Sequence, residues 1–416
     1  MQLKTILNRV EHFKSFVYGN FQFVEGEERP AIEVEVLARK NSRPICSGCR
    51  RSRPGYDRLP KRRFEFVPLW GIAVYFVYAM RRVDCPHCGV TVERVPWVRG
   101  KSHLTTTYRW FLARWAKRLS WEEVAEIFHT TWRNVFESVR RAVWWGVAHQ
   151  NLAGIEAIGV DEIQWHRGHC YLTVVYQIED GLKRLLWVAE DRTEDSLRRF
   201  FKSLGEGRRS IRFVCSDMWK QYIKVIAEQL PEAVHVLDRF HIMKKMNEAI
   251  EEVRRSEAAR LKRDGYEEVL KHSRWCLLKR PQNRTEKETV KLKELLQYNL
   301  QAVRSLLQKE DFQRFWEYTS PTWAVKFLDQ WCVRTMRSKI EPMKKVAGML
   351  RRHRALILNW FRAKGEISAG SVEGLNNKAK LTLRKAYGFR TYEAIEIALF
   401  HTLGNLPEPN FTHEFC

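Results

Sequence analysis

The sequence lacks a long hydrophobic run. Its most apolar stretch, FVPLWGIAVYFVYAM at residues 66–80, is interrupted by Pro68 and Gly71. A helix that crosses a bilayer needs about 20 apolar residues, so this shorter stretch predicts strands. The first residues, MQLKTILNRVEHFKSFVYG, also lack the apolar core of a secretory signal. We therefore expect a cytoplasmic protein with no membrane partner.

Acidic residues are scarce relative to basic ones. The 416 residues include 73 Lys and Arg against 49 Asp and Glu, a formal net charge of +24. Such an excess favours a polyanionic partner, and nucleic acid is favoured over a membrane surface. Hydrophobic residues make up 44% of the chain, enough to form a real core. The length predicts two to four domains, and we find no internal repeat.

Four of the nine cysteines form two CxxC pairs, Cys46/Cys49 and Cys85/Cys88. Without a secretory signal, thiols at this spacing favour a metal over disulfides. Four thiolates suit a tetrahedral structural Zn²⁺ site, and a hairpin between the pairs would make a zinc ribbon. The alternative is four unrelated buried cysteines.

Residues 107–143 have the pattern of a helix-turn-helix. Ser120 followed by Glu123 predicts a capping box, HTT a compact turn, and WRNVFESVRRAV a second helix. The alternative is a plain helical hairpin. The residues expected to face DNA are Arg133, Asn134, Ser138 and Arg141.

Residues from about 154 to 243 alternate between strand and helix patterns. Three consecutive segments rich in β-branched and aromatic residues are followed by helix, strand, helix and strand. The predicted order βββαβαβ is that of an RNase-H-like mixed α/β sheet.

Acidic residues follow two of these strands. Asp161 follows EAIGV and Asp217 follows IRFVC, on strands expected to lie side by side. Two such carboxylates suit Mg²⁺, and a third would allow two ions. The best third candidate is Glu373, where a Gly/Ser loop leads into a helix. The pattern leaves Glu162 open as an alternative ligand to Asp161. Further DNA contacts are expected from Asn376, Lys378 and Lys380.

Two other features allow a functional and a structural interpretation. In VHVLDRFHIMKKM, Asp238 and His241 suit a metal pair, a catalytic pair, or a helix N-cap followed by an ordinary histidine. Residues 333–364 contain ten Lys and Arg and one acid, Glu341, which suits DNA contact or a solvated surface.

Together these motifs resemble bacterial insertion-sequence transposases, and more narrowly their ISL-three group. The resemblance rests on the CxxC pairs, GVDE, SDMW, DRFH and SVEGLNNKAKLTLRKAYGFRTYEAIE, and it covers nearly the whole chain. It implies a DDE triad of Asp161, Asp217 and Glu373 that holds two Mg²⁺ or Mn²⁺ ions. Asp238 and His241 would lie at the edge of this site.

The resemblance also implies a function and a domain order. We expect an enzyme that binds the double-stranded ends of an insertion sequence, cuts them and joins them to target DNA as a homodimer or larger assembly. The alternatives are a sequence-specific repressor and an RNase-H-like nuclease without strand transfer. The predicted domains are a zinc ribbon (1–98), a helix-turn-helix (99–150), a split catalytic domain (151–244 and 366–416) and a large helical insertion (245–365).

Overall fold

The computed structural model describes residues 3–25, 29–166, 168, 170–266, 268–363, 370–385 and 389–410. Contacts divide the chain into two compact units. The first comprises Met1–Gln150 and Leu381–Cys416, and the second comprises Asn151–Lys380. Both contain a sheet and helices, which confirms the mixed α/β class. The predicted boundary at 365/366 lies outside the described residues.

The first unit contains a five-stranded sheet with a long hairpin. Its elements are α1 (Leu3–Val10), β1 (Phe16–Glu25), β2 (Pro30–Ala38), β3 (Gly55–Leu69), β4 (Ile72–Cys85) and β5 (Gly89–Val92). The order is β1-β2-β4-β3, with β5 paired to β4. β3 and β4 form the antiparallel hairpin expected between the CxxC pairs. Phe64, Phe76 and Trp97 are among the aromatic residues of the core.

Four helices complete the first unit. They are α2 (Thr106–Trp115), α3 (Trp121–Ile127), α4 (Trp132–His149) and α15 (Tyr392–Leu403). Ser120 and Glu123 form the predicted capping box of α3, and the Thr131 hydroxyl caps α4. Val124 and Val139 are fully buried, so α3 and α4 pack through their apolar faces.

The second unit is built on another five-stranded sheet. Its elements are β6 (Ala157–Gln164), β7 (Tyr171–Glu179), β8 (Leu182–Ala189), α5 (Glu194–Leu204), β9 (Phe213–Ser216), α6 (Lys220–Gln229) and β10 (Val234–Leu237). The strand order is β10-β9-β6-β7-β8. β6, β7 and β8 are antiparallel, whereas β9 is parallel to both β6 and β10.

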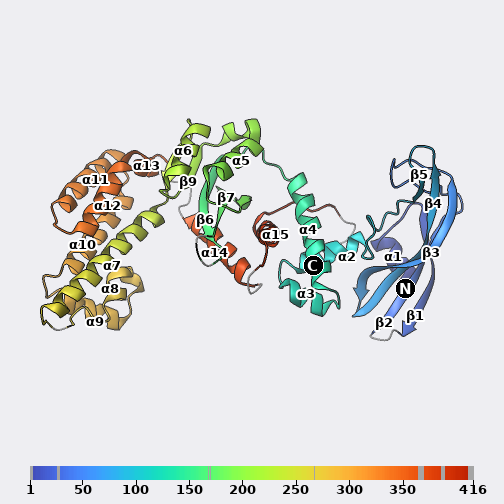
Figure 1. Ribbon diagram of the computed structural model, residues 1–416, viewed down its shortest axis with the longest axis horizontal. Helices are drawn as coiled ribbons and strands as arrows, with labels where there is room; N and C mark the ends of the chain where they lie inside the picture. Colours follow the sequence, from blue (N-terminus) through green and yellow to red (C-terminus); the bar gives the residue numbers. More distant parts are fainter. Residues whose placement is uncertain are drawn as a thin grey trace. The chain divides into compact units, whose positions relative to one another are not determined.

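The two faces of this sheet are covered by different helices (Figure 1). Ile158 and Val160 belong to the core formed with α5 and α6. On the other face lies α14 (Gly370–Lys385), and a Cβ at Gly159 would stand 2.4 Å from the Cγ2 of Val372. Because side chains alternate along a strand, Asp161 follows Gly159 on the α14 face.

The chain from the end of β10 to residue 363 is helical. Its helices are α7 (Arg239–Arg263), α8 (Arg274–Leu278), α9 (Glu286–Leu295), α10 (Gln301–Gln313), α11 (Pro321–Met336), α12 (Glu341–Arg352) and α13 (Arg354–Leu358). They share one core, which includes Met246, Phe312 and Trp331. α7 continues unbroken across residues 244 and 245, where the sequence predicted a boundary. Within the described residues, no helix is long and apolar enough to cross a membrane.

Candidate active site

Three aspartates occupy equivalent positions on neighbouring strands of the second sheet. Ser216 at the end of β9 pairs with Val160 on β6 and with Leu237 on β10. The next residue on each strand is an aspartate: Asp161, Asp217 and Asp238. Since the three strands are parallel, these residues lie side by side at one edge of the sheet. All three side chains are buried, with at most 8% of each residue exposed.

Asp161 is held by residues from distant parts of the chain. Its Oδ2 accepts a hydrogen bond from the Nδ2 of Asn376 on α14. The same oxygen lies 3.7 Å from the Nε2 of His241 on α7. Burial opposes protonation of His241, but the hydrogen bond and attraction to Asp161 and its neighbours raise the pKa of the imidazole.

Glu162, the alternative to Asp161, is engaged elsewhere. Its carboxylate forms an ion pair with the Nε of Arg192. Arg192 also reaches Asp217, with 3.5 Å between its Nη2 and the Oδ2. Burial raises the pKa of Glu162, and Arg192 opposes that rise. Arg192 therefore offsets negative charge on both carboxylates.

Asp217 and Asp238 occupy similar positions. Asp217 accepts from the backbone N–H of Trp219 at 3.0 Å, and Asp238 accepts from that of Phe240 at 2.8 Å. Asp238 is the N-cap of α7, as one interpretation of the sequence predicted. Burial is the main cause that raises the pKa of each group, to about 6 for Asp238. The charges of Asp161 and Glu373 add to the rise at Asp238.

Glu373 lies in the first turn of α14, because the helix begins at Gly370. α14 packs on the Asp161 face of the sheet through Val372 and Asn376, and Glu373 belongs to the same helix. The acids are thus brought to one region, but they do not form a tight ligand set. Within the described residues, only the four CxxC cysteines have ligand atoms that all lie within 4.8 Å of one another.

The four cysteines of the first unit form a group that fits a metal ion. The Sγ atoms of Cys49 and Cys85 are 3.6 Å apart. A hydrogen bond with Thr91 is the main cause that lowers the pKa of Cys46 to about 6, which favours the thiolate. A Cβ at Gly48 would stand 2.8 Å from the Sγ of Cys88, so this turn requires glycine. The donor set suits zinc, as the spacing predicted.

The predicted DNA contacts divide into exposed and buried residues. Arg133 and Arg141 are exposed on α4, as are Lys378 and Lys380 on α14, and Asn134 is half-buried. Ser138 is 1% exposed and its hydroxyl donates to the carbonyl of Asn134 at 2.6 Å. Asn376 is also buried, against Asp161. In this structure neither Ser138 nor Asn376 is available to DNA, because each faces the core rather than the polar side of its helix.

The basic stretch 333–364 is partly neutralised within its own unit. Arg334 pairs with Asp311, Lys345 with Glu252 and Arg354 with Asp329. Lys344 pairs with Glu341, the one acid of the stretch, and Lys364 lies outside the described residues. For the paired residues, a solvated protein surface is therefore favoured over contact with DNA.

Two residues of the site were missed from the sequence. Arg192 stands in a turn after β8, and no local pattern indicates that it reaches two carboxylates. Tyr176 resembles any core residue of β7, yet its hydroxyl donates to the Oδ1 of Asn376 at 2.9 Å. Its buried position raises the pKa of the phenol, so it remains a donor.

A comparison with solved structures gives the Drosophila P element transposase strand transfer complex. The identity is 8% and the TM-score 0.44, covering 74% of this chain and 93% of that chain.

Sequence comparisons are more informative. The family model for DDE transposases of the ISL3 (ISL-three) group, described as "Transposase", matches residues 158–399. The transposase for insertion sequence element IS1001 of Bordetella parapertussis is 28% identical, over 89% of this chain and 91% of its own length. The transposase for insertion sequence element IS1557 of Mycobacterium tuberculosis (strain CDC 1551 / Oshkosh) is 29% identical, over 95% of this chain and 94% of its own length. The chain belongs to the ISL3 group of DDE transposases, enzymes that cleave DNA and transfer its strands.

Proposed function

We propose that this transposase cuts and joins DNA at a divalent-metal site held by Asp161, Asp217 and Glu373, in an RNase-H-like fold. The observation that carries the proposal is the strand register, which aligns Asp161 and Asp217 on neighbouring parallel strands. α14 brings Glu373 and Asn376 to the same face of the sheet. The element order βββαβαβ supports the fold assignment.

The donor set fits a hard cation such as Mg²⁺ or Mn²⁺. Carboxylate oxygens are the preferred protein ligands of Mg²⁺. Burial raises the pKa of Asp217, and Asp161 adds to the rise, so the metal-free site holds crowded negative charge. Two bound ions would stabilise the attacking and leaving oxygens of phosphodiester exchange.

The surrounding residues orient these carboxylates. Asn376 holds the Oδ2 of Asp161, and Tyr176 fixes which way the Asn376 amide points. Arg192 keeps Glu162 in an ion pair, which favours Asp161 as the ligand. Asp238 and His241 lie at the edge of the site, where His241 limits repulsion among the aspartates.

DNA recognition is assigned to the first unit. α3 and α4 form a helix-turn-helix with Arg133 and Arg141 exposed on its second helix. A zinc ion held by the four cysteines would stabilise the ribbon. Lys378 and Lys380 are exposed on α14, the helix that carries Glu373, and would contact phosphates. We expect a homodimer or larger assembly, since two element ends must be joined.

The test uses DNA that carries the element's ends, with and without Mg²⁺. Asp161→Asn and Glu373→Gln should bind this DNA as the wild type does but should not cut it. Asp180→Asn, which changes an exposed acid in the β7–β8 turn, is the matched control. Normal cutting by either site variant would reject the triad. Joining of precleaved ends to target DNA separates a transposase from a nuclease.

A further inference from the structure

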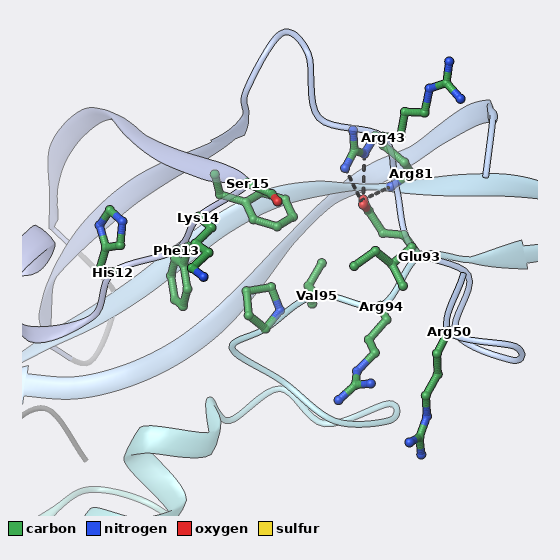
Figure 2. Close-up of a pocket in the computed structure, with 13 residues that line it drawn as sticks. His12, Phe13, Lys14, Ser15, Arg43, Arg50, Arg81, Glu93, Arg94 and Val95 are labelled. Atoms are coloured by element: carbon green, nitrogen blue, oxygen red, sulfur yellow. Dashed lines mark hydrogen bonds and ion pairs between the residues drawn. The ribbon is translucent and has the colours of Figure 1, made fainter. Parts of the chain in front are cut away.

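The first unit contains a cavity of about 430 Å³ (Figure 2). Its lining includes Ile45 and Arg50, which flank the first CxxC pair in the sequence. It is lined by residues from before β1, from the turn around Cys46, from β4 and from the segment after β5. The volume is within the range of ~300–1,000 Å³ that is typical of small-molecule pockets. It exceeds what a single phosphate group requires.

Five Lys and Arg residues line this cavity, and Arg81 is already paired with Glu93; the other four are Lys14, Arg43, Arg50 and Arg94. All four are exposed, and among the described residues none of them has an ion-pair partner. The one acid in the lining, Glu93, is 3% exposed and already satisfied. It accepts hydrogen bonds from the hydroxyl of Tyr78 at 2.7 Å and from the Nε of Arg81 at 2.9 Å. The cavity therefore attracts an anion.

Besides these charged residues, His12 and Ser15, the lining is apolar. Phe13, Phe16 and Val95 are buried in the wall, whereas Ile45 and Pro96 are exposed beside the cations. The backbone of a paired duplex presents only phosphate and sugar to a protein surface. An unpaired nucleotide presents a phosphate and an apolar base face together. The combination of cations and apolar wall matches the second ligand.

The positions of the cations depend on the cysteine turn. Arg50 has a positive φ of 61°, and its backbone N–H donates to the carbonyl of Cys46 at 3.0 Å. The backbone N–H of Arg94 donates to the carbonyl of Ile45 at 2.7 Å. Arg81 joins the same turn through a 2.9 Å hydrogen bond to the carbonyl of Ser42. A metal held by the cysteines would thus hold the cavity in shape.

We propose that this cavity binds one unpaired nucleotide of DNA. The phosphate lies among Arg43, Arg50 and Arg94, and the base lies against Ile45 and Pro96. This inference rests on the proposed function in that DNA is the substrate, and it adds a site for single-stranded DNA to the first unit. It requires neither the acids of the second unit nor Mg²⁺.

The experiment measures binding of labelled DNA to the full-length, zinc-loaded protein without Mg²⁺. The probes are a short single-stranded dT oligonucleotide, an abasic oligonucleotide of the same length, and a blunt duplex. The site variant is Arg43→Gln/Arg94→Gln. The control is Arg51→Gln/Arg99→Gln, which removes the same charge from exposed residues of the same segments outside the lining. Zinc content and thermal unfolding verify that both variants fold.

The wild type should bind dT about tenfold or more tightly than the abasic probe, because the abasic probe has no base to bury against Ile45 and Pro96. The site variant should lose this preference and the control should keep it. Equal affinity of the wild type for dT and abasic DNA would overturn the proposal. So would equal weakening in both variants, which indicates general electrostatic attraction. Normal cutting by Asp161→Asn or Glu373→Gln, by contrast, would reject only the proposed catalytic site and would leave this nucleotide site untouched.

Discussion

The Nδ2 of Asn376 donates to the Oδ2 of Asp161, joining α14 to β6 across 215 residues of the chain. The Oδ1 of the same amide accepts from Tyr176, so the amide has one favourable orientation. A carboxylate fixed in this way needs little rearrangement to take up a metal ion. Residues that orient metal ligands typically change affinity or activity by about 10- to 100-fold when removed.

Asn376→Ala should therefore lower the rate of metal-dependent cleavage by about 10- to 100-fold while leaving DNA affinity unchanged. It should also lower the free energy of unfolding by about 1–3 kcal/mol, because Tyr176 loses its buried acceptor. Asn377→Ala, at the exposed neighbouring position, is the control for both measurements. Unchanged cleavage by Asn376→Ala would mean that Asp161 is oriented by other contacts.

Close packing between β6 and α14 gives a second prediction. A Cβ at Gly159 would stand 2.4 Å from Val372, too close for real atoms. Gly159→Ala should displace α14, reduce cleavage and lower the free energy of unfolding by about 1–3 kcal/mol. Adding Val372→Ala removes the clash, so the double variant should recover part of the lost cleavage activity and part of the lost free energy of unfolding. If the effects of the two substitutions on cleavage and on the free energy of unfolding were simply additive, the contact between Gly159 and Val372 would not determine the position of α14.

Asp217 and Asp238 follow neighbouring strands in the same register, and a third experiment separates them. Asp217→Asn should abolish Mg²⁺ binding measured by calorimetry. Asp238→Asn should weaken it only moderately, because Asp238 already caps α7. Asp180→Asn serves again as the control. The opposite order of effects would exchange the roles of the two aspartates.

His235 predicts a dependence of stability on pH. Burial lowers its pKa in the folded protein to about 4, from 6.5 in the unfolded chain. The unfolded state therefore binds more protons between these values, so stability is complete above pH 6.5 and falls as the pH decreases towards 4. The loss attributable to this group is at most about 3.5 kcal/mol.

Denaturant unfolding across this pH range provides the measurement. His235→Gln should show a smaller loss of stability on acidification than the wild type. His272→Gln, at an exposed histidine of the same unit, should behave as the wild type does. Parallel pH profiles for all three proteins would contradict the assignment to His235.

The cysteine cluster gives a fifth prediction. Wild-type protein should contain close to one zinc per chain, and Cys49→Ser should lose it with a drop in thermal stability, since structural zinc contributes directly to folding. Cys170→Ser, which changes an exposed cysteine outside the cluster, should retain the metal. Metal analysis of the purified proteins decides the matter. Zinc-free wild-type protein would contradict the assignment.

Local patterns in the sequence were enough to predict much of the fold. The capping box at Ser120 and Glu123, the N-cap at Asp238 and the strand–helix order of residues 157–237 appear as expected. Each depends on residues a few positions apart, where side-chain spacing directly determines hydrogen bonding and burial. The mixed α/β class follows from such patterns, whereas the transposase activity was implied by the resemblance to a known family.

The sequence by itself therefore determined the elements, the cysteine group and the acids available for a metal site. Only the tertiary structure decided which side chains meet. Asn376 looked like a DNA contact but turns towards Asp161, and Ser138 lies in the core of its helix pair. Arg192 joins Glu162 to Asp217 without any local signal. The physical reason is that these contacts cross between elements far apart in the chain, where strand register and helix packing set the distances.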